Sequence, residues 1–208
     1  LITPARQTLD DFDSRSRLKF QFDPSQTKRT FRIAMSDASH LTLLPRLFKS
    51  IRARAPYAAV EAVPINQPDL AEGLAQGKID IAIGAAKQLD SGVYQRVLYS
   101  QRWVSLRRMG HPVRDLDMAR FMAAEHIDVT YGTVRSIFQS SLAKLGLTQR
   151  IGLSMPGFLG LPSIVASSDL IVTLPSQIGQ ALAQIGGLQI ADCPLEIDPF
   201  DVKLYWHT

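Results

Sequence analysis

The sequence of 208 residues contains a single cysteine and no long apolar run. Cys193 on its own excludes an internal disulfide and a zinc site built from several thiolates, and it favours a reducing compartment. No apolar stretch approaches the roughly 20 residues that a membrane-spanning helix requires. The opening residues Leu1 to Arg6 lack the basic-then-apolar order of a secretory signal and do not begin with Met. We therefore expect a cytoplasmic, water-soluble protein whose N-terminus is cut from a longer chain.

Common catalytic and nucleotide-binding motifs are absent as well. The sequence holds no GxSxG nucleophile turn, no GxGxxG and no GxxxxGK followed by Ser or Thr. The four histidines, which are His40, His111, His126 and His207, form no HxH or HxxxH pair, so no metal site is predicted. We expect a chain that is not an enzyme and carries no cofactor.

The individual histidines have different interpretations. His111 lies in Gly110-His111-Pro112 and is interpreted as an exposed turn residue, whereas His126 opens a strand and is interpreted as structural. His40 lies where a strand ends and a helix begins, and the pattern leaves open whether it is structural or contacts a ligand. Cys193 has no suitable partner beside it and is expected to be unreactive.

The first 29 residues differ from the rest of the chain. Hydrophobic residues make up 46% and charged residues 20% of the whole sequence, which is typical of a globular protein. The beginning, by contrast, has few bulky apolar side chains among charges of both signs. It predicts an exposed helix from about Thr3 to Phe20, followed by a turn at Phe22-Asp23-Pro24-Ser25. We expect this segment to be a linker or a partner-contacting helix.

A basic helix face does not by itself predict DNA binding. The net charge is +4, and an electrostatic footprint needs clustering on one face. One helix does carry four basic residues largely opposite its apolar stripe, namely Arg46, Lys49, Arg52 and Arg54. Because no recognition-helix motif accompanies them, a solvated face or a subunit interface is favoured.

From Thr30 onwards, apolar strands alternate with amphipathic helices. Strands are expected at 31–35, 60–64 and 79–83. The helix after the first strand has Pro45 in its first turn, and the next begins with a capping-box pair, Asp69 and Glu72, and ends at Gly77. This order indicates a parallel sheet with crossover helices. A second such unit follows, with strands expected at 103–106, 126–130, 150–154 and 170–174, helices at 115–123, 135–145, 158–166 and 175–184, and tail strands at 188–191 and 201–206.

The second unit is inserted within the first. The chain leaves the first half near Arg102 to Arg108 and returns near Gly186, and two such crossings make a hinge and a cleft. We predict a linker at 1–29, a first lobe at 30–105 plus 187–208 and a second lobe at 106–186. Ligands of open α/β sheets bind beyond the carboxyl ends of the strands, so a small molecule is expected between the lobes.

Several helix N-termini would converge on this cleft. Each is preceded by a short segment between a strand and a helix, and these segments begin at Ser36, Asn66, Tyr131, Pro156 and Thr173. Free backbone N–H groups at a helix start favour an anionic group, although simple capping is the plainer interpretation of any single one. Phe158 would supply an apolar wall for a planar ligand.

Several segments resemble the effector-binding domain of LysR-type transcriptional regulators. They are Thr30-Phe31-Arg32-Ile33-Ala34-Met35-Ser36-Asp37, Leu44-Pro45-Arg46-Leu47, Arg54-Ala55-Pro56, and the segments 69–74 and 77–84. The opening Leu1 to Ala5 is similar to the start of the family's linker helix. Gly110 to Val113 and Leu204 to His207 look like the branch of nodulation regulators and aromatic-degradation activators.

The resemblance implies an α/β fold of the periplasmic-binding-protein type (type 2), with two Rossmann-like lobes joined by a two-stranded hinge. It implies a small-molecule inducer in the cleft, an aromatic acid or a phenol, and a homodimer or homotetramer. Promoter DNA would be bound through an N-terminal winged helix-turn-helix that lies outside this chain, and the family continues beyond the position of Thr208 into a helix that packs on the first lobe. The family's inducer contacts, carried over position by position, fall on Ser39, His40, Asn66, Gln67, Thr133, Phe158, Thr173 and Pro175.

Two other functions remain open at this point. A free-standing solute-binding protein of the same fold predicts a signal peptide upstream of Leu1, where the regulator predicts a winged helix-turn-helix. An enzyme of this architecture needs an acid–base pair or a metal in the cleft. Asp37 and Asp80 are better interpreted as a helix cap and a sheet-edge residue than as such a pair.

Overall fold

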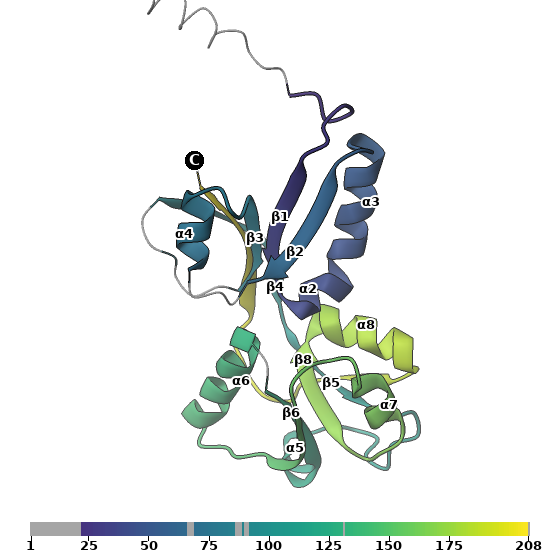
Figure 1. The fold of residues 1–208 in the computed structure, drawn as a ribbon. Coiled ribbons are helices and arrows are strands. Elements are labelled where there is room, and N and C mark those ends of the chain that lie inside the picture. Colours follow the sequence, from purple (N-terminus) through teal and green to yellow (C-terminus); the bar gives the residue numbers. More distant parts are fainter. Residues whose placement is uncertain (1–21, 66–68, 86–88, 90–91, 131, 208) are drawn as a thin grey trace, which may run out of the picture.

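The protein consists of two α/β lobes, one above the other in Figure 1. The structure, a computed structural model, describes residues 22–65, 69–85, 89, 92–130 and 132–207. The predicted helix from about Thr3 to Phe20 lies outside these residues. The predicted turn at Phe22–Ser25 is confirmed, because Asp23 accepts hydrogen bonds from the backbone N–H of Ser25 at 2.9 Å and from its hydroxyl at 2.7 Å.

Helices and strands alternate along most of the chain. In chain order they are β1 (Thr30–Met35), α2 (Asp37–Thr42), α3 (Leu44–Arg54), β2 (Ala59–Pro64), α4 (Leu70–Ala75), β3 (Ile81–Gly84), β4 (Val93–Gln101), β5 (Trp103–Arg107), α5 (Met118–Ala123), β6 (Glu125–Val129), α6 (Gly132–Lys144), β7 (Arg150–Met155), α7 (Leu161–Ala166), β8 (Ile171–Pro175), α8 (Ser176–Gly186), β9 (Gln189–Asp192) and β10 (Phe200–His207).

Each lobe is built on a five-stranded sheet. The first has the order β2-β1-β3-β10-β4 and the second the order β7-β6-β8-β5-β9. Strands β1, β2 and β3 are parallel, as are β6, β7 and β8, which confirms the crossover pattern. Each sheet is nevertheless mixed, because β10 runs antiparallel to β3 and β5 runs antiparallel to β8. These antiparallel strands are the ones that follow a crossing between the lobes.

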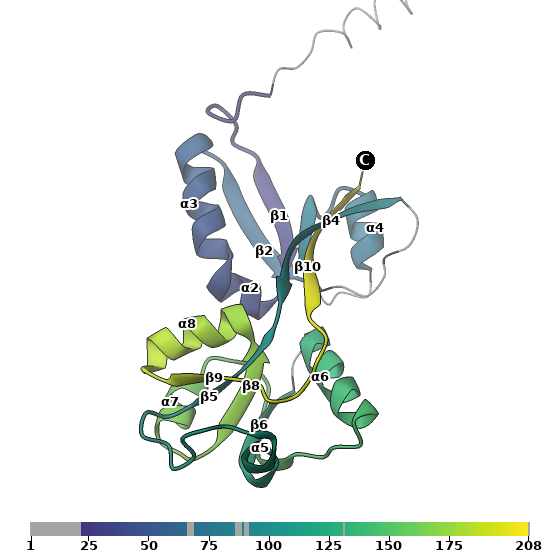
Figure 2. The same cartoon turned by 180° about the vertical axis from the view of Figure 1, so that it is seen from behind.

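The sheets also divide the chain at points that differ from the sequence-based boundaries. Strand β5 pairs with β8 and β9, so the segments 103–107 and 189–192 both belong to the second sheet. Strand β4, an edge strand not anticipated from the sequence, pairs with β10 in the first sheet. Figure 2 shows these two long strands side by side where they lead toward the second lobe. The two crossings lie at Arg102 and between Asp192 and Phe200.

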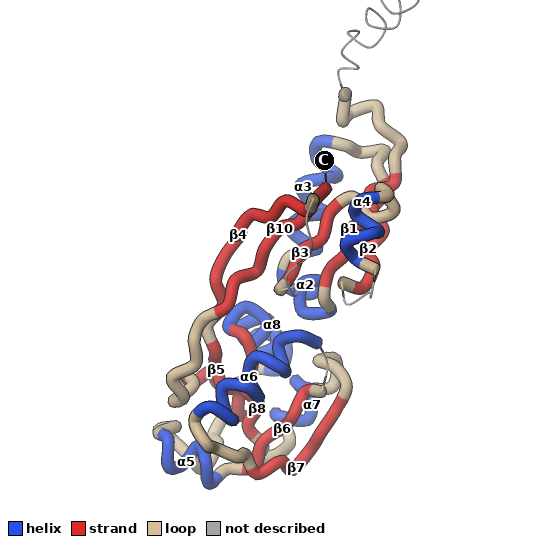
Figure 3. The backbone as a smooth tube through the Cα atoms, turned by 90° about the vertical axis from the view of Figure 1, so that its left-hand side faces the viewer, coloured by secondary structure: helices blue, strands red, loops and turns tan. Residues whose placement is uncertain are grey.

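Alternation along the strands decides which layer each side chain joins. In β1, Ile33 and Met35 pack with the half-buried leucines at the start of α3, whereas Ala34 faces the other way, toward Leu70 and Leu74 of α4. In the second lobe, Leu106 joins a core with Leu161 of α7 and Ile178 of α8. Trp103 points to the opposite face, where it packs on Phe138 of α6 at a ring distance of 5.0 Å. Each sheet is therefore covered by helices on both faces, as Figure 3 shows from the side.

Helix α2 links the two lobes. It is a separate short helix just before α3, and Pro45 occupies the first turn of α3 as predicted. Ala38 of α2 packs against the core of the second lobe. In Figure 1, α2 lies directly above α8. This contact places the beginning of the first helical segment at the boundary between the lobes.

Several local predictions have clear outcomes. The capping box at Asp69 is wrong, because its side chain makes no capping hydrogen bond, whereas Gly77 has the positive φ (+66°) expected after the helix. His126 is structural as predicted: it is 1% exposed and its Nε2 lies 2.7 Å from the Phe121 carbonyl oxygen. Burial raises the pKa of the Cys193 thiol to about 11, which agrees with its expected low reactivity.

His111 is not the exposed turn residue that the sequence suggested. It is 6% exposed, its Nε2 lies 3.0 Å from the Asp169 carbonyl oxygen, and its Nδ1 accepts a hydrogen bond from the Val113 N–H at 3.1 Å. The ring therefore ties the turn after β5 to the loop before β8. Its main partner is 58 residues away in the chain, which explains why the local Gly-His-Pro pattern did not reveal it.

Candidate ligand-binding site

A pocket of about 730 Å³ lies where the two lobes meet. Its walls come from α2 of the first lobe, from α8 and from the loop between β7 and α7. This volume is within the range of small-molecule sites. The lining side chains are apolar apart from two, and they are Asp37, His40, Leu41, Met155, Pro156, Phe158, Leu159, Pro162, Ile178, Leu182 and Ile185.

Local hydrogen bonds fix the α2 wall. Ser36 is the N-cap, and its hydroxyl oxygen accepts a hydrogen bond from the Ser39 N–H at 3.3 Å and lies 3.1 Å from the Ser39 hydroxyl. Ser39 is 5% exposed and turned into the protein. The side chains of Asp37, His40 and Leu41 are then the ones that α2 presents to the pocket.

His40 has an unusual environment for a polar side chain. Its Nδ1 lies 3.7 Å from the Asp37 carboxylate, and 37% of the side chain is exposed. Its Nε2, by contrast, is closed off from solvent and has no hydrogen-bond partner in the described part of the chain. Buried polar groups nearly always have a partner, so an unpaired ring nitrogen requires an explanation.

The opposite wall is shaped by a glycine. Gly157 has a φ of +140°, a conformation that residues with a side chain rarely adopt. The turn places Phe158 half-buried against the core of the second lobe and leaves Leu159 98% exposed. Helix α7 begins only at Leu161, so the predicted helix start at Phe158 is wrong. Residues 156–160 form a loop between β7 and α7.

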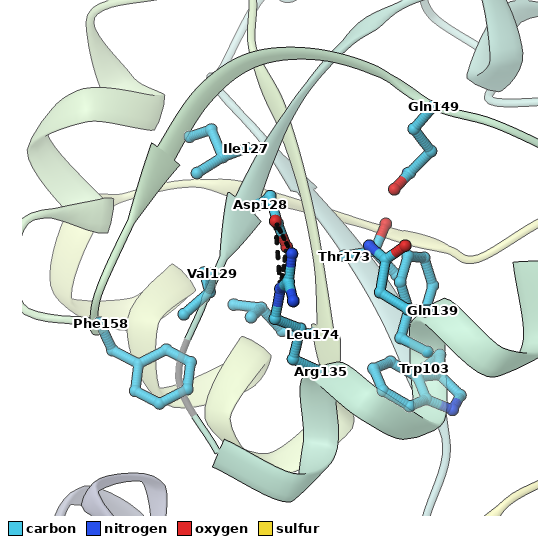
Figure 4. Close-up of a pocket in the computed structure, with 11 residues that line it drawn as sticks. Trp103, Ile127, Asp128, Val129, Arg135, Gln139, Gln149, Phe158, Thr173 and Leu174 are labelled. Atoms are coloured by element: carbon cyan, nitrogen blue, oxygen red, sulfur yellow. Dashed lines mark hydrogen bonds and ion pairs between the residues drawn. The ribbon is translucent and has the colours of Figure 1, made fainter.

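A second, smaller cavity adjoins Phe158 within the second lobe. Its volume is about 40 Å³, enough for a few water molecules but not for an organic ligand. Figure 4 shows Arg135 of α6 beside Asp128 of β6, with three hydrogen-bond distances of 2.7, 3.0 and 3.1 Å between them. The bidentate pair raises the pKa of Arg135. Thr173 also lines this cavity, and its hydroxyl lies 3.1 Å from that of Ser105.

The structure brings only some of the predicted contacts together. His40 and Phe158 line the same pocket, and Thr173 shares the smaller cavity with Phe158. Thr133 lies in the first turn of α6. Asn66 and Gln67 lie outside the described residues. Ser39 and Pro175 line neither cavity, because Ser39 belongs to the α2 cap and Pro175 is buried at the end of β8 opposite Trp103.

The start of α8 is held by residues of the hinge. Gln101, at the end of β4 and 6% exposed, accepts hydrogen bonds from the Ser176 hydroxyl at 3.0 Å and the Gln177 N–H at 3.1 Å. The Ser176 N–H donates to the Arg102 carbonyl oxygen at 2.8 Å. The hinge itself therefore satisfies the backbone N–H groups of Ser176 and Gln177 at this helix end.

The α8 side of the pocket was missed at the sequence level. Ile178, Leu182 and Ile185 recur at helical spacing and line the pocket. The spacing alone shows an apolar stripe, and only the position of α2 shows that part of the stripe faces the other lobe. The Asp128–Arg135 pair was also missed, since a strand and a helix carry its two members.

The described ranges hold neither a candidate metal site nor a candidate membrane span. No cluster of three or more His, Cys, Asp or Glu residues there is placed to hold a metal ion. No helix among those residues has the length and apolar character needed to cross a membrane.

Two α/β lobes with two chain crossings and a pocket between them define a ligand-binding domain of the periplasmic-binding-protein type. A family model described as the LysR substrate binding domain matches residues 24–208, and the chain belongs to this family. It is thus the ligand-sensing domain of a LysR-type regulator, as the sequence motifs implied.

Known relatives are transcription regulators rather than enzymes. The HTH-type transcriptional activator NagR of a Ralstonia species is 28% identical, covering 100% of this chain and 70% of NagR. The HTH-type transcriptional regulator LinR of Sphingobium indicum is 33% identical, covering 90% of this chain and 63% of LinR. Nodulation protein D 1 of Rhizobium tropici is 29% identical, covering 89% and 61%. These relatives confirm the predicted branch, and the chain spans 61% to 70% of their length.

A solved structure supports the same assignment. The regulatory domain of MexT, a transcriptional activator in Pseudomonas aeruginosa, superimposes with a TM-score of 0.75 at 28% identity. The match covers 86% of this chain and 89% of that domain. The alternative of a free-standing solute-binding protein therefore has no support from these comparisons.

Proposed function

We propose that the pocket between α2 and α8 binds a small inducer, an aromatic acid or a phenol. The observation that carries the proposal is the pocket itself, which is mainly apolar and has walls from both lobes. Phe158 lines the pocket and offers an aromatic face from the second lobe. His40 and Phe158 line this pocket. Thr133 and Thr173 of the second lobe, and Asn66 and Gln67 of the first, are proposed to complete the site.

Binding between two lobes can act on their arrangement. A ligand shifts a conformational equilibrium only by its differential affinity for the two states. A ligand wedged between α2 and α8 contacts both lobes at once, so its affinity depends on their separation. The two crossings, at Arg102 and at 193–199, are the segments that such a movement would bend.

In the full-length protein, this change is proposed to reach promoter DNA. The relatives NagR and LinR are both named as HTH-type regulators, and this chain spans only part of each. We propose a cytoplasmic homodimer or homotetramer that binds DNA through an N-terminal winged helix-turn-helix. Helix α3 offers a surface for assembly, because none of its residues is buried and Phe48 is 41% exposed. A chain that stays monomeric at high concentration would argue against this surface.

A thermal-shift screen tests inducer binding. The panel consists of small aromatic acids, phenols, flavonoids and amino acids. A ligand at about 100 times its dissociation constant is expected to add roughly 2.7 kcal/mol of stability, which is a shift of several degrees. The Phe158→Ala variant is expected to bind the same ligand about tenfold more weakly, since it loses an aromatic wall.

The matched control is Leu145→Ala, which also shortens a partly exposed apolar side chain but lies beyond α6 and lines neither cavity. It is expected to bind like the unmodified chain. Equal losses in both variants, or no loss in Phe158→Ala, would remove this pocket from consideration.

A further inference from the structure

The polar chemistry of the pocket narrows the ligand class further than the fold does. Among the residues that the structure describes, no lysine or arginine lines the pocket, and Asp37 supplies the only formally charged side chain. Helix α8 and the loop from Met155 to Pro162, which form the facing walls, contain no charged residue. A carboxylate ligand would therefore bring a second negative charge near Asp37, with no cation among the described lining residues to balance it.

The position of Asp37 also assigns the role of each His40 nitrogen. A carboxylate beside one ring nitrogen favours a proton on that nitrogen. With Nδ1 3.7 Å from Asp37, this geometry favours the tautomer of neutral His40 that carries its proton on Nδ1. Nε2 then carries a lone pair and is a hydrogen-bond acceptor.

This acceptor, His40 Nε2, is the polar atom of the site that lacks a hydrogen-bond partner among the described residues. Nε2 is closed off from solvent and has no partner within the described residues. An acceptor that is buried without a donor destabilises the arrangement that buries it. A ligand that supplies a donor removes this penalty, and one that supplies only acceptors does not.

Resting on the proposed function, we infer that the ligand is an uncharged, mainly apolar molecule with a hydroxyl group that donates a hydrogen bond to His40 Nε2. Of the two classes proposed above, this selects a phenol over an aromatic acid. Asp37 acts as a positioning residue, because it holds the proton on the far side of the ring. The apolar walls from Phe158, Ile178 and Leu182 take the rest of the molecule.

The burial of Nε2 links recognition to movement. Because the atom is covered, a hydroxyl reaches it only after the covering atoms shift. His40 lies on α2, the helix whose Ala38 packs against the core of the second lobe. The new hydrogen bond therefore favours an arrangement in which the atoms that cover Nε2 have shifted, at the helix that contacts the second lobe.

A matched set of probes tests the inference by titration calorimetry on the purified chain. The probes are 4-phenylphenol, 4-methoxybiphenyl and biphenyl-4-carboxylate, which share two rings and differ in the polar group. We expect 4-phenylphenol to bind about tenfold or more tightly than either of the others. In His40→Phe, which keeps an aromatic ring without the acceptor, 4-phenylphenol is expected to lose about tenfold while 4-methoxybiphenyl is unchanged.

Asp37→Asn separates positioning from simple packing. Without the carboxylate, the preference for the phenol over biphenyl-4-carboxylate is expected to fall at least threefold, since the second negative charge is no longer opposed. Tighter binding of the carboxylate by the unmodified chain, or equal loss of all three probes in His40→Phe, overturns the inference but leaves the pocket as a binding site. Failure of all three probes to bind overturns both the inference and the proposed function.

Discussion

Replacing Arg107 with methionine is expected to lower the free energy of unfolding by about 3 kcal/mol. Arg107 is 3% exposed and donates to the carbonyl oxygens of Val113 and Arg114 at 2.5 and 2.6 Å and to the Gln189 side chain at 3.0 Å. Methionine fills a similar length but donates nothing, so these acceptors lose their partner inside the protein. Urea denaturation followed by circular dichroism measures the difference.

The neighbouring arginine provides the control. Arg108 is paired with Asp169 at 2.7 Å, but the two side chains are 32% and 61% exposed. Exposed ion pairs contribute little, so Arg108→Met is expected to cost less than about 1 kcal/mol. Arg107→Lys is expected to fall between the two, because one ammonium group does not reproduce the planar guanidinium. A cost for Arg107→Met no larger than that of Arg108→Met would contradict the role assigned to Arg107.

The second large effect is a loss of stability in mild acid that depends on His126. Burial lowers the pKa of His126, and the hydrogen bond to the Phe121 carbonyl only partly opposes this. When the pH falls below the ordinary histidine pKa of 6.5, the unfolded chain binds a proton at His126, whereas the folded chain does not yet bind it. The contribution is thus fully present above about pH 6.5 and is lost as the pH falls, by up to about 1.4 kcal/mol per pH unit.

His126→Gln isolates this contribution, since glutamine retains a donor for the Phe121 carbonyl but does not titrate in this range. Unfolding free energies of both proteins are measured between pH 5 and pH 8. The difference between their pH slopes below pH 6.5 belongs to His126, because the other titrating groups are shared. Parallel curves would mean that the folded protein accommodates the proton.

Local patterns in the sequence predicted the parts of the fold that depend on neighbouring residues. The apolar run of β1 and the Gly77 helix end were predicted because each is set within a few residues. Strand β4 was missed, because six of its nine residues are exposed at the sheet edge and it lacks a continuous apolar run. The role of Gln101 depends on a helix 75 residues later, and no local pattern encodes such a contact.

The candidate site divides in the same way. Phe158 was predicted from its position after a strand and from the family motifs, and it does line the pocket. That His40 lines the same pocket follows from the packing of α2 on the second lobe, which places both residues together. The unpaired Nε2 of His40 and the apolar α8 wall could not be predicted from the sequence, since both depend on how two separate lobes meet.

The central claim is that a ligand between α2 and α8 changes the arrangement of the lobes. Double electron–electron resonance measures this arrangement directly as a distance between two spin labels. The labels are placed at Lys49 of α3 and Lys144 of α6, which are both exposed and lie one in each lobe. The labels are attached to Lys49→Cys and Lys144→Cys in a Cys193→Ser background. The best-binding compound of the screen is expected to shift the distance distribution at saturation. In Phe158→Ala, whose affinity is about tenfold lower, the same shift is expected to need about tenfold more ligand. An unchanged distribution in a chain saturated with ligand would contradict the claim.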